Sequence, residues 1–425
     1  MECDTVYSKS AKLFILIIMI TFLLTSPHFS RESGGEVVES NNLFTVELYQ
    51  QLKNEGENIL ISPFSVFNAF AMLYPGSDGQ TRDVISQTMH FEQNLQEFLD
   101  DIMQLQSSFE PIREYEKPAL NIANSLWAQQ GYPILDSYLS ILQEYFQSEI
   151  RSVDFSDSLK TANEINQWVS DKTNEKIKEI ITPDIIGQLT TLILCNAIHF
   201  KGAWMHPFSE ENTKSESFFV SPTEDIQVNM MSHQKEYHYQ EYDGFKLLEM
   251  PYRKEYNEQR EPISKADYSM IIFLPDKESS LEELENQLNY YLMKSYISSL
   301  MRSESVQVAV KFPKFRVENN FNLNEPLMAM GMENPFTSLA DFSKITGKKD
   351  LFISDVIHKT YIEVDEKGTE AAAVTAIIMP RGAMPGPVEE VKQFHVDRPF
   401  MYLIRENSSG SIIFIGKVTN PEPSR

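Results

Sequence analysis

The sequence predicts one large α+β domain, because helical patterns dominate its first half, strand patterns dominate its second half, and no linker or internal repeat separates them. Its 425 residues are 42% hydrophobic and 23% charged, which is ordinary globular composition with ample material for a large core. Helices and strands that follow each other without a composition boundary favour one domain over several. Residues 31–425 are therefore expected to form it.

Two stretches are typical of amphipathic helices. Residues 93–109 place leucine, phenylalanine and isoleucine at the spacing of one helical face. The second begins at Thr161-Ala-Asn-Glu164, which has the form of a capping box, and continues with apolar residues at helical spacing to Ile181. Pro183 then predicts its end.

Strand patterns follow along the rest of the chain. Residues 191–200, 269–274 and 306–312 are apolar or alternating runs of strand length. Residues 400–405 and 411–418 predict a terminal hairpin around a polar turn. That turn holds a sequon, Asn407-Ser-Ser409, so Asn407 is the expected glycan site if the chain is secreted.

The first 30 residues differ from the rest and predict a secretory signal. Lys9 and Lys12 precede the apolar run Leu13–Leu24, which is shorter than the roughly 20 residues that span a membrane. The expected location is extracellular, with the cleavage point left open. The alternative is an uncleaved anchor that holds the protein at a membrane. Removal of the signal would also remove Cys3 and leave Cys195, in an apolar run, as a buried inert thiol.

Composition and motifs exclude several function classes. The formal net charge of −24 argues against nucleic-acid binding, which needs clustered Lys and Arg. The sequence has no Gly-x-Ser-x-Gly elbow, no dinucleotide or phosphate loop and no strong metal-ligand spacing among its eight histidines. A catalytic triad is defined by geometry, and nothing in the sequence indicates one. We expect no cofactor, no metal and no enzymatic activity.

Residues 361–387 combine two incompatible compositions. Strand-like Tyr361–Asp365 leads into 366–378, whose small alternating side chains would fit a crowded sheet. Residues 379–387 are rich in proline and glycine, which keep a chain exposed and non-helical. Arg381 in this loop would suit a protease with an acidic specificity pocket. The alternative is a surface loop with an incidental arginine.

A series of motifs in the chain resembles the serpin family from about residue 40 to the end. Any one of them is weak, whereas so many in the family's order are specific. They are Asn58–Ser65, Leu120–Trp127, Ile165–Val169, Asn196–Trp204, Ala340–Ser343, His358-Lys359, Glu366–Ala373, Asp397–Phe400 and Phe414–Pro421.

This resemblance implies a fold and a mechanism. The fold is a single domain with helices around a large central five-stranded sheet, two further sheets and an exposed reactive loop at about 366–393. A target protease attacks the loop and forms an acyl-enzyme, and the loop then inserts into the central sheet as an added strand, which traps the protease. Such a protein is a suicide-substrate inhibitor without a catalytic residue of its own. The alternative within the family is a non-inhibitory carrier or chaperone.

The resemblance also assigns roles to residues of this sequence. Thr369 matches the first side chain that must enter the sheet, where a small residue permits insertion and a charge would block it. Trp204 matches the top of the sheet, where insertion starts. The residues that match the family's hinge are Glu366, Gly368, Thr369, Ala371, Ala372 and Ala373. Those that match the sheet-opening cluster are Ser62, Ser65, Asn196 and His358, and Trp204 is assigned to the same opening process.

The scissile bond is expected at Arg381–Gly382. Family spacing counted from Glu366 puts it after Gly382, but arginine is the better specificity determinant, and Met384 is a third option. Met379, Pro380 and Ala383 complete the loop that a protease would contact. The expected partner is a trypsin-like serine protease, with thrombin-like enzymes as a subclass.

Two further partner predictions follow. In the family, heparin binds a basic helix, but the matching residues 93–110 carry four acidic side chains and no Lys or Arg, so heparin is not an expected partner. The protein is expected to act as a monomer and to contact a membrane only if the N-terminal segment is uncleaved.

Overall fold

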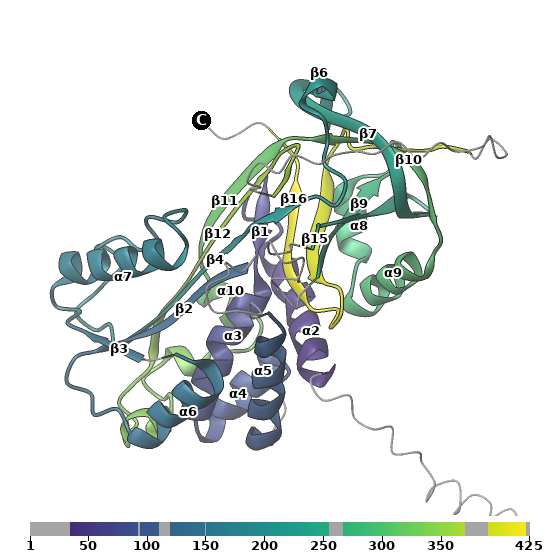
Figure 1. The fold of residues 1–425 in the computed structure, drawn as a ribbon. Coiled ribbons are helices and arrows are strands. Elements are labelled where there is room, and N and C mark those ends of the chain that lie inside the picture. Colours follow the sequence, from purple (N-terminus) through teal and green to yellow (C-terminus); the bar gives the residue numbers. More distant parts are fainter. Residues whose placement is uncertain are drawn as a thin grey trace, which may run out of the picture.

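The computed structural model describes residues 35–91, 94–109, 120–148, 150–254, 267–369 and 390–421. They form a mixed central sheet, a second extended sheet, and helices that pack around both (Figure 1). Most of the α-helices of the first half lie together at one end of the central sheet, while α7 (Ser158–Lys172) covers its outer face.

The central sheet has five long strands in the spatial order β3-β2-β4-β12-β11. The pairs β2–β4 and β11–β12 are antiparallel, whereas β4 and β12 are parallel neighbours. Two short strands, β13 (Gly368–Thr369) and β5 (Gly202–Ala203), fill the end of the sheet beside β12. The long strands are β2 (Leu120–Gln129), β3 (Ile150–Val153), β4 (Leu192–Phe200), β11 (Phe315–Asn322) and β12 (Ile353–Val364).

The remaining strands form two sheets that share one long strand, β7 (Glu224–Tyr242). Its first part pairs with β6, its middle with β10 and its last residues with β8, so the two further sheets are continuous through it. Their other strands are β1 (Ile59–Ile61), β6 (Lys214–Ser221), β8 (Phe245–Pro251), β9 (Tyr268–Pro275), β10 (Ser305–Pro313), β14 (Lys392–His395), β15 (Phe400–Glu406) and β16 (Ile412–Val418).

The helices pack an apolar face on these sheets. Helix α3 is buried along its whole length and contacts β2, β4 and β16, which places its first turn under the middle of the central sheet. The other helices are α2 (Gly35–Leu52), α3 (Pro63–Leu73), α4 (Gly79–Met89), α5 (Leu95–Phe109), α6 (Asp136–Phe146), α8 (Leu281–Gln287), α9 (Tyr290–Arg302), α10 (Asn324–Ala329) and α11 (Ser343–Thr346).

Burial on both faces explains why the sequence of strand β4 is apolar without alternation. Every residue of Leu192–Phe200 is buried, because one face packs on the main core and the other on the cluster beneath α7. Ile193 and Cys195 point to α7, while Leu194 and Ile198 point to the main core. A strand covered on both faces needs no polar side. Cys195 is fully buried, and burial raises the pKa of its thiol, as expected for an inert cysteine.

Helix α7 differs from its prediction at both ends. Asp157, not Thr161, caps it by accepting a hydrogen bond from the Lys160 N–H, and Thr161 bonds instead to the Asp154 carbonyl. The helix ends at Lys172, since Asn174 and Glu175 adopt positive φ and turn the chain.

The apolar spacing beyond Lys172 belongs to a returning segment. Ile180 and Ile181 are buried there, and the Asn166 side chain holds the segment by bonding to the backbone of both residues. Apolar spacing alone therefore overestimated the length of the helix.

The other predicted elements are confirmed within one or two residues. These are the helix α5 and the strands β4, β9, β10, β15 and β16. The division into early helices and late strands is only partly correct, because β2 and β3 from the first half pair directly with the central strands.

Candidate functional site

Three polar side chains lie in one row across the central sheet. Asn196 on β4 is in register with Asn124 on β2 and with His358 on β12. All three occupy the face toward helix α3, whose N-terminal turn supplies Ser62 and Ser65. The structure thus brings together four of the five residues assigned to sheet opening, and we call these four with Asn124 the polar row.

Hydrogen bonds connect the polar row from β2 to β12. The Asn196 amide donates to Ser65 Oγ at 2.5 Å and also bonds to Asn124 Oδ1. Ser65 Oγ donates to Asn124 Oδ1 at 2.9 Å, and the Asn124 amide returns a bond to the Ser65 carbonyl at 3.0 Å. The network therefore links helix α3 to both strands of the β2–β4 pair.

His358 joins this network across the β4–β12 junction. Its Nε2 accepts the Ser62 backbone N–H at 3.0 Å, so the proton resides on Nδ1, which donates to Asn196 Oδ1. Burial lowers the pKa of His358 to about 3, and the imidazole is neutral at physiological pH. Separating β12 from β4 would break the His358–Asn196 bond.

The hinge begins where β4 and β12 diverge. At that end of the sheet, Thr369 pairs with Val364 of β12 on one side and with Gly202 of β5 on the other. Gly368 and Thr369 thus lie between β12 and β5, next to the end of the β4–β12 junction.

A glycine is required at position 368 because β13 packs closely against the backbone of β5. A Cβ on Gly368 would lie 2.1 Å from the Gly202 carbonyl oxygen, and its φ of +154° also disfavours a side chain. Asp365 holds the preceding turn, because its carboxylate accepts the backbone N–H groups of Lys367 and Gly368 at 2.8 and 3.2 Å.

Thr369 and Trp204 belong to one buried contact. The Thr369 hydroxyl bonds to Tyr252 Oη at 2.7 Å, and the Tyr252 ring stacks on Trp204 with a centroid separation of 4.5 Å. Trp204 Nε1 in turn donates to the Asp365 carbonyl at 3.1 Å. Trp204 therefore lies at the hinge rather than in the polar row, as its predicted place at the top of the sheet requires.

Glu366 anchors the hinge electrostatically. Its largely buried carboxylate forms an ion pair with Lys314 at 2.8 Å and accepts a hydrogen bond from Thr213 at 2.7 Å. Burial favours the neutral acid, but these two partners outweigh it and hold the pKa of Glu366 below its usual value.

Sequence reasoning missed Asn124, Tyr252, Thr213 and Lys314. A signal for Asn124 was present, because it is the one polar residue on a strand face that is otherwise Leu, Ile and Ala, and a buried amide must find a partner. Tyr252, Thr213 and Lys314 are remote in sequence from the hinge and carried no local signal.

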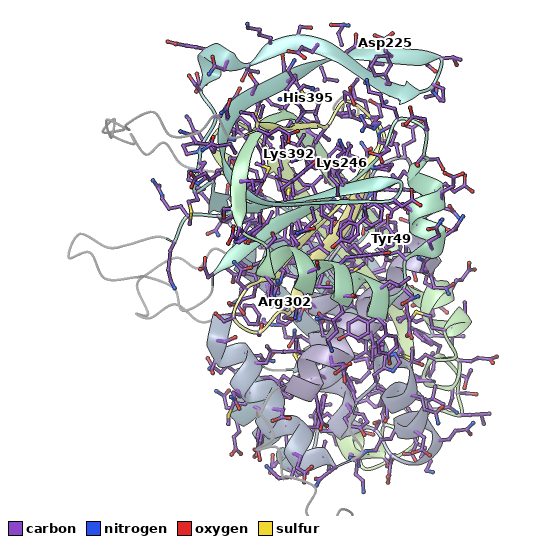
Figure 2. All side chains as sticks on the ribbon, turned by 90° about the vertical axis from the view of Figure 1, so that its right-hand side faces the viewer. Tyr49, Asp225, Lys246, Arg302, Lys392 and His395 are labelled. Atoms are coloured by element: carbon purple, nitrogen blue, oxygen red, sulfur yellow. The ribbon has the colours of Figure 1, made fainter. Side chains whose placement is uncertain are left out.

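The reactive loop itself is only partly described. Its far end joins β14, which pairs with β10 in parallel from Lys392 to His395; both residues are labelled in Figure 2. Residues 370–389 lie outside the described residues. Ala371, Ala372, Ala373, Met379, Pro380, Arg381, Gly382, Ala383 and Met384 are among them, so their roles stay predictions. The N-terminal segment 1–30 and Glu110 are likewise not described.

The predicted glycan site has an inward-facing amide. Asn407 Nδ2, the atom that would carry the glycan, donates to Ser269 Oγ at 2.9 Å, and Oδ1 is buried. Glycosylation stays a prediction, and it would require this side chain to rotate outward.

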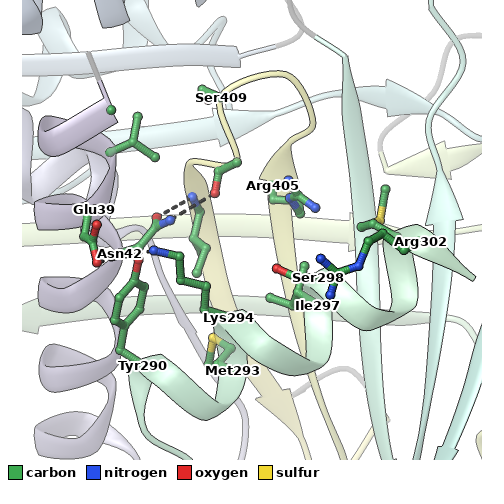
Figure 3. A pocket seen from close by; sticks show the side chains of 15 residues that line it. Glu39, Asn42, Tyr290, Met293, Lys294, Ile297, Ser298, Arg302, Arg405 and Ser409 are labelled. Atoms are coloured by element: carbon green, nitrogen blue, oxygen red, sulfur yellow. Dashed lines mark hydrogen bonds and ion pairs between the residues drawn. The ribbon is translucent and has the colours of Figure 1, made fainter. Parts of the chain in front are cut away.

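Away from the hinge, a cavity of about 430 Å³ opens between α2, α9 and the β15–β16 hairpin (Figure 3). Lys294 lines it and pairs with Glu39 at 3.3 Å, and Arg302 and Arg405 stand at the other end. Among the described residues there is no cluster of metal-ligating side chains, and none of the described helices is long and apolar enough to cross a membrane.

The close packing of Gly368 generates a first prediction. Gly368→Ala should lower the free energy of unfolding by about 2 kcal/mol, because the added methyl collides with backbone that cannot rotate away. The midpoint of a denaturant titration measures this change. Gly56→Ala is the matched control, since a Cβ there meets only ordinary contacts, and it should change the value by less than about 0.5 kcal/mol. Equal midpoints for the two variants would contradict the role of Gly368.

The burial of His358 generates a second prediction. Below the ordinary pKa of 6.5, the unfolded chain takes up a proton that the buried imidazole refuses until about pH 3. The free energy of unfolding should therefore fall as the pH drops through this window, by up to about 1.4 kcal/mol per pH unit for this residue.

Denaturant titrations across this window test the role of His358. His199 and His233, whose pKa values burial lowers to about 4, contribute to the same slope. His358→Gln should therefore flatten the dependence without abolishing it. An unchanged slope in that variant would assign the whole effect to other groups.

Comparison with known proteins agrees with this arrangement. The model of the family "Serpin (serine protease inhibitor)" matches residues 39–421. Human Serpin B3 is 33% identical over 400 residues, which cover 90% of this chain and 99% of Serpin B3. Bovine leukocyte elastase inhibitor is 36% identical over 402 residues, covering 90% and 98% of the two chains.

A solved structure extends the likeness to the fold. Human thyroxine-binding globulin, determined with its ligand, superposes with a TM-score of 0.79 at 28% identity, covering 92% of this chain and all of that one. The relatives thus include a protease inhibitor and a carrier, and the family is one of inhibitors rather than enzymes. Because the family model matches nearly the whole described chain, this protein is a member of the serpin family.

Proposed function

We propose that this protein is a secreted suicide-substrate inhibitor of a trypsin-like serine protease. One observation carries the proposal: Gly368 and Thr369 already pair with both β12 and β5 at the end of the β4–β12 junction. A chain that continues from Thr369 along this junction would become a strand between β4 and β12. The parallel β4–β12 ladder and the His358–Asn196 hydrogen bond would have to separate to admit it.

The composition of the hinge supports inhibition over carriage. The Thr369 side chain is fully buried, and strand alternation would send Ala371 and Ala373 to the same face. Small uncharged side chains enter a packed sheet at little cost, whereas a charge would have to lose its hydration.

The chemistry of trapping is supplied by the protease. Its serine oxygen would attack the carbonyl carbon of Arg381, the bond to the Gly382 nitrogen would break, and the amine would leave with a proton from the protease histidine. The resulting ester ties the protease to the hinge side of the loop. Insertion would then move the ester away from the site at which it formed, before water hydrolyses it.

The proposed secretion of the protein and the proposed specificity of its target protease are inferred from the sequence. The segment 1–30 has the form of a secretory signal, and Arg381 would fill an acidic specificity pocket. N-terminal sequencing of the mature protein separates a cleaved signal from a retained anchor.

The hinge generates a third prediction. Thr369→Arg should convert the inhibitor into a substrate, because a guanidinium would replace the hydroxyl that is buried against Tyr252. Incubation with trypsin followed by denaturing electrophoresis should show a covalent complex for the parent protein and only cleavage for the variant.

Lys367→Arg is the matched control for this experiment. It changes a neighbouring side chain that is 44% exposed, and it should leave complex formation intact. Undiminished complex formation by Thr369→Arg would remove the proposed role of the hinge.

The reactive bond generates a fourth prediction. Arg381→Ala should reduce the rate of complex formation with trypsin by at least about a hundredfold, since the residue that fills the specificity pocket is gone. Lys367→Arg is again the control and should react at the parent rate. Mass spectrometry of the released C-terminal fragment should place its first residue at Gly382. A fragment that begins at Ala383 or Pro385 would move the bond to one of the alternatives.

A second candidate function is carriage of a small ligand. The cavity between α2 and α9 favours it, together with the similarity to thyroxine-binding globulin. Clean cleavage of the loop without a covalent complex, combined with saturable binding of thyroxine, would select carriage and reject inhibition.

A further inference from the structure

A second cavity lies on another side of the molecule, between the end of β6, the start of α8, the β14–β15 connection and the end of β16. Its volume is about 600 Å³, within the range of small-molecule sites. It shares no lining residue with the hinge, with the polar row or with the cavity between α2 and α9. Binding here would be an activity separate from the proposed inhibition.

The walls of this cavity are mainly apolar. Phe219 and Val220 line it from β6, Leu281 lines it from the first turn of α8, and three prolines complete the surface. Phe219 leaves 44% of its surface exposed at the rim, which is unusual for a phenylalanine. An apolar ligand would cover this ring and gain the free energy of burial.

A buried ammonium group also lines the cavity. Lys417 of β16 is only 8% exposed, and its Nζ lies 3.4 Å from Glu285 Oε1. That oxygen also accepts the hydroxyl of Tyr49. Glu285 Oε1 is thus shared between Lys417 and Tyr49, and an ammonium has three N–H donors, so a ligand carboxylate could accept a further N–H of Lys417.

The other charges around the cavity are balanced. Arg398 is paired with Asp397 and also donates from Nε to the Pro275 carbonyl at 2.7 Å. Lys277 and Glu282 stand on the lining with opposite charge. The charged side chains of the lining therefore balance in number, and we expect the apolar walls and Lys417 to select the ligand.

We propose that this cavity binds an aliphatic carboxylic acid, with its chain against Phe219, Val220 and Leu281 and its carboxylate on Lys417. A carboxylate would accept a charge-assisted hydrogen bond from the ammonium, and the chain would cover the exposed ring. Each methylene buried should tighten binding by up to about fourfold.

Calorimetric titration of the full-length protein with dodecanoate, below its micelle concentration, tests the proposal. We expect one saturable site, and dodecan-1-ol should bind at least about tenfold more weakly because it lacks the charge. Val220→Trp should abolish binding by filling the cavity from its half-exposed wall. Ser298→Trp fills the cavity between α2 and α9 instead and should bind dodecanoate like the parent.

The role of Lys417 has its own measurement. Lys417→Met keeps an apolar stem and should make the acid and the alcohol bind equally. If this variant does not fold, the proposal is still tested by the ratio of the dodecanoate and dodecan-1-ol affinities in the parent and by the affinity of Val220→Trp. Absence of saturable binding, equal affinity of the two ligands for the parent, or full affinity in Val220→Trp would each overturn the proposal.

Discussion

The parallel pairing of β4 with β12 is the interaction on which the rest of the structure depends. Both strands are central. They pair from Ile353 and Leu192 to Tyr361 and His199, with one register shift between Ile353 and Asp355. Beyond Tyr361 the two strands diverge, and Gly368 and Thr369 of the hinge pair there with β12 and β5. The same junction therefore closes the core and offers the place at which an added strand could enter.

The polar row makes this junction specific rather than merely stable. A row of Asn124, Asn196 and His358 satisfies its donors and acceptors only when the three strands keep their present register over helix α3. Apolar side chains in the same positions would slide with little penalty, whereas a shifted amide or imidazole loses its partner in a dry environment. Separation of β4 from β12 would break the His358–Asn196 bond together with the backbone ladder, so the row would contribute to the cost of opening.

Much of the fold followed from patterns that one segment carries by itself. The two-sided burial of β4 was visible as an unbroken apolar run, and the hairpin of β15 and β16 was visible as two strands around a polar turn. The end of α7 was not, because the positive φ of Asn174 and Glu175 and the Asn166 contacts to a returning segment decide it. Local periodicity does not distinguish a helix from a segment that packs beneath it.

For the candidate site, the sequence by itself determined the small side chains of Thr369, Ala371 and Ala373 in the hinge, the arginine in the loop and, through the family resemblance, four members of the polar row. Only the tertiary structure decided that Thr369 meets Tyr252, that Glu366 meets Lys314 and Thr213, and that Asn124 completes the row. These partners come from strands and loops far apart in the chain. The reason is physical: composition records what a segment tolerates, whereas the position of a hydrogen-bond partner depends on how distant segments pack.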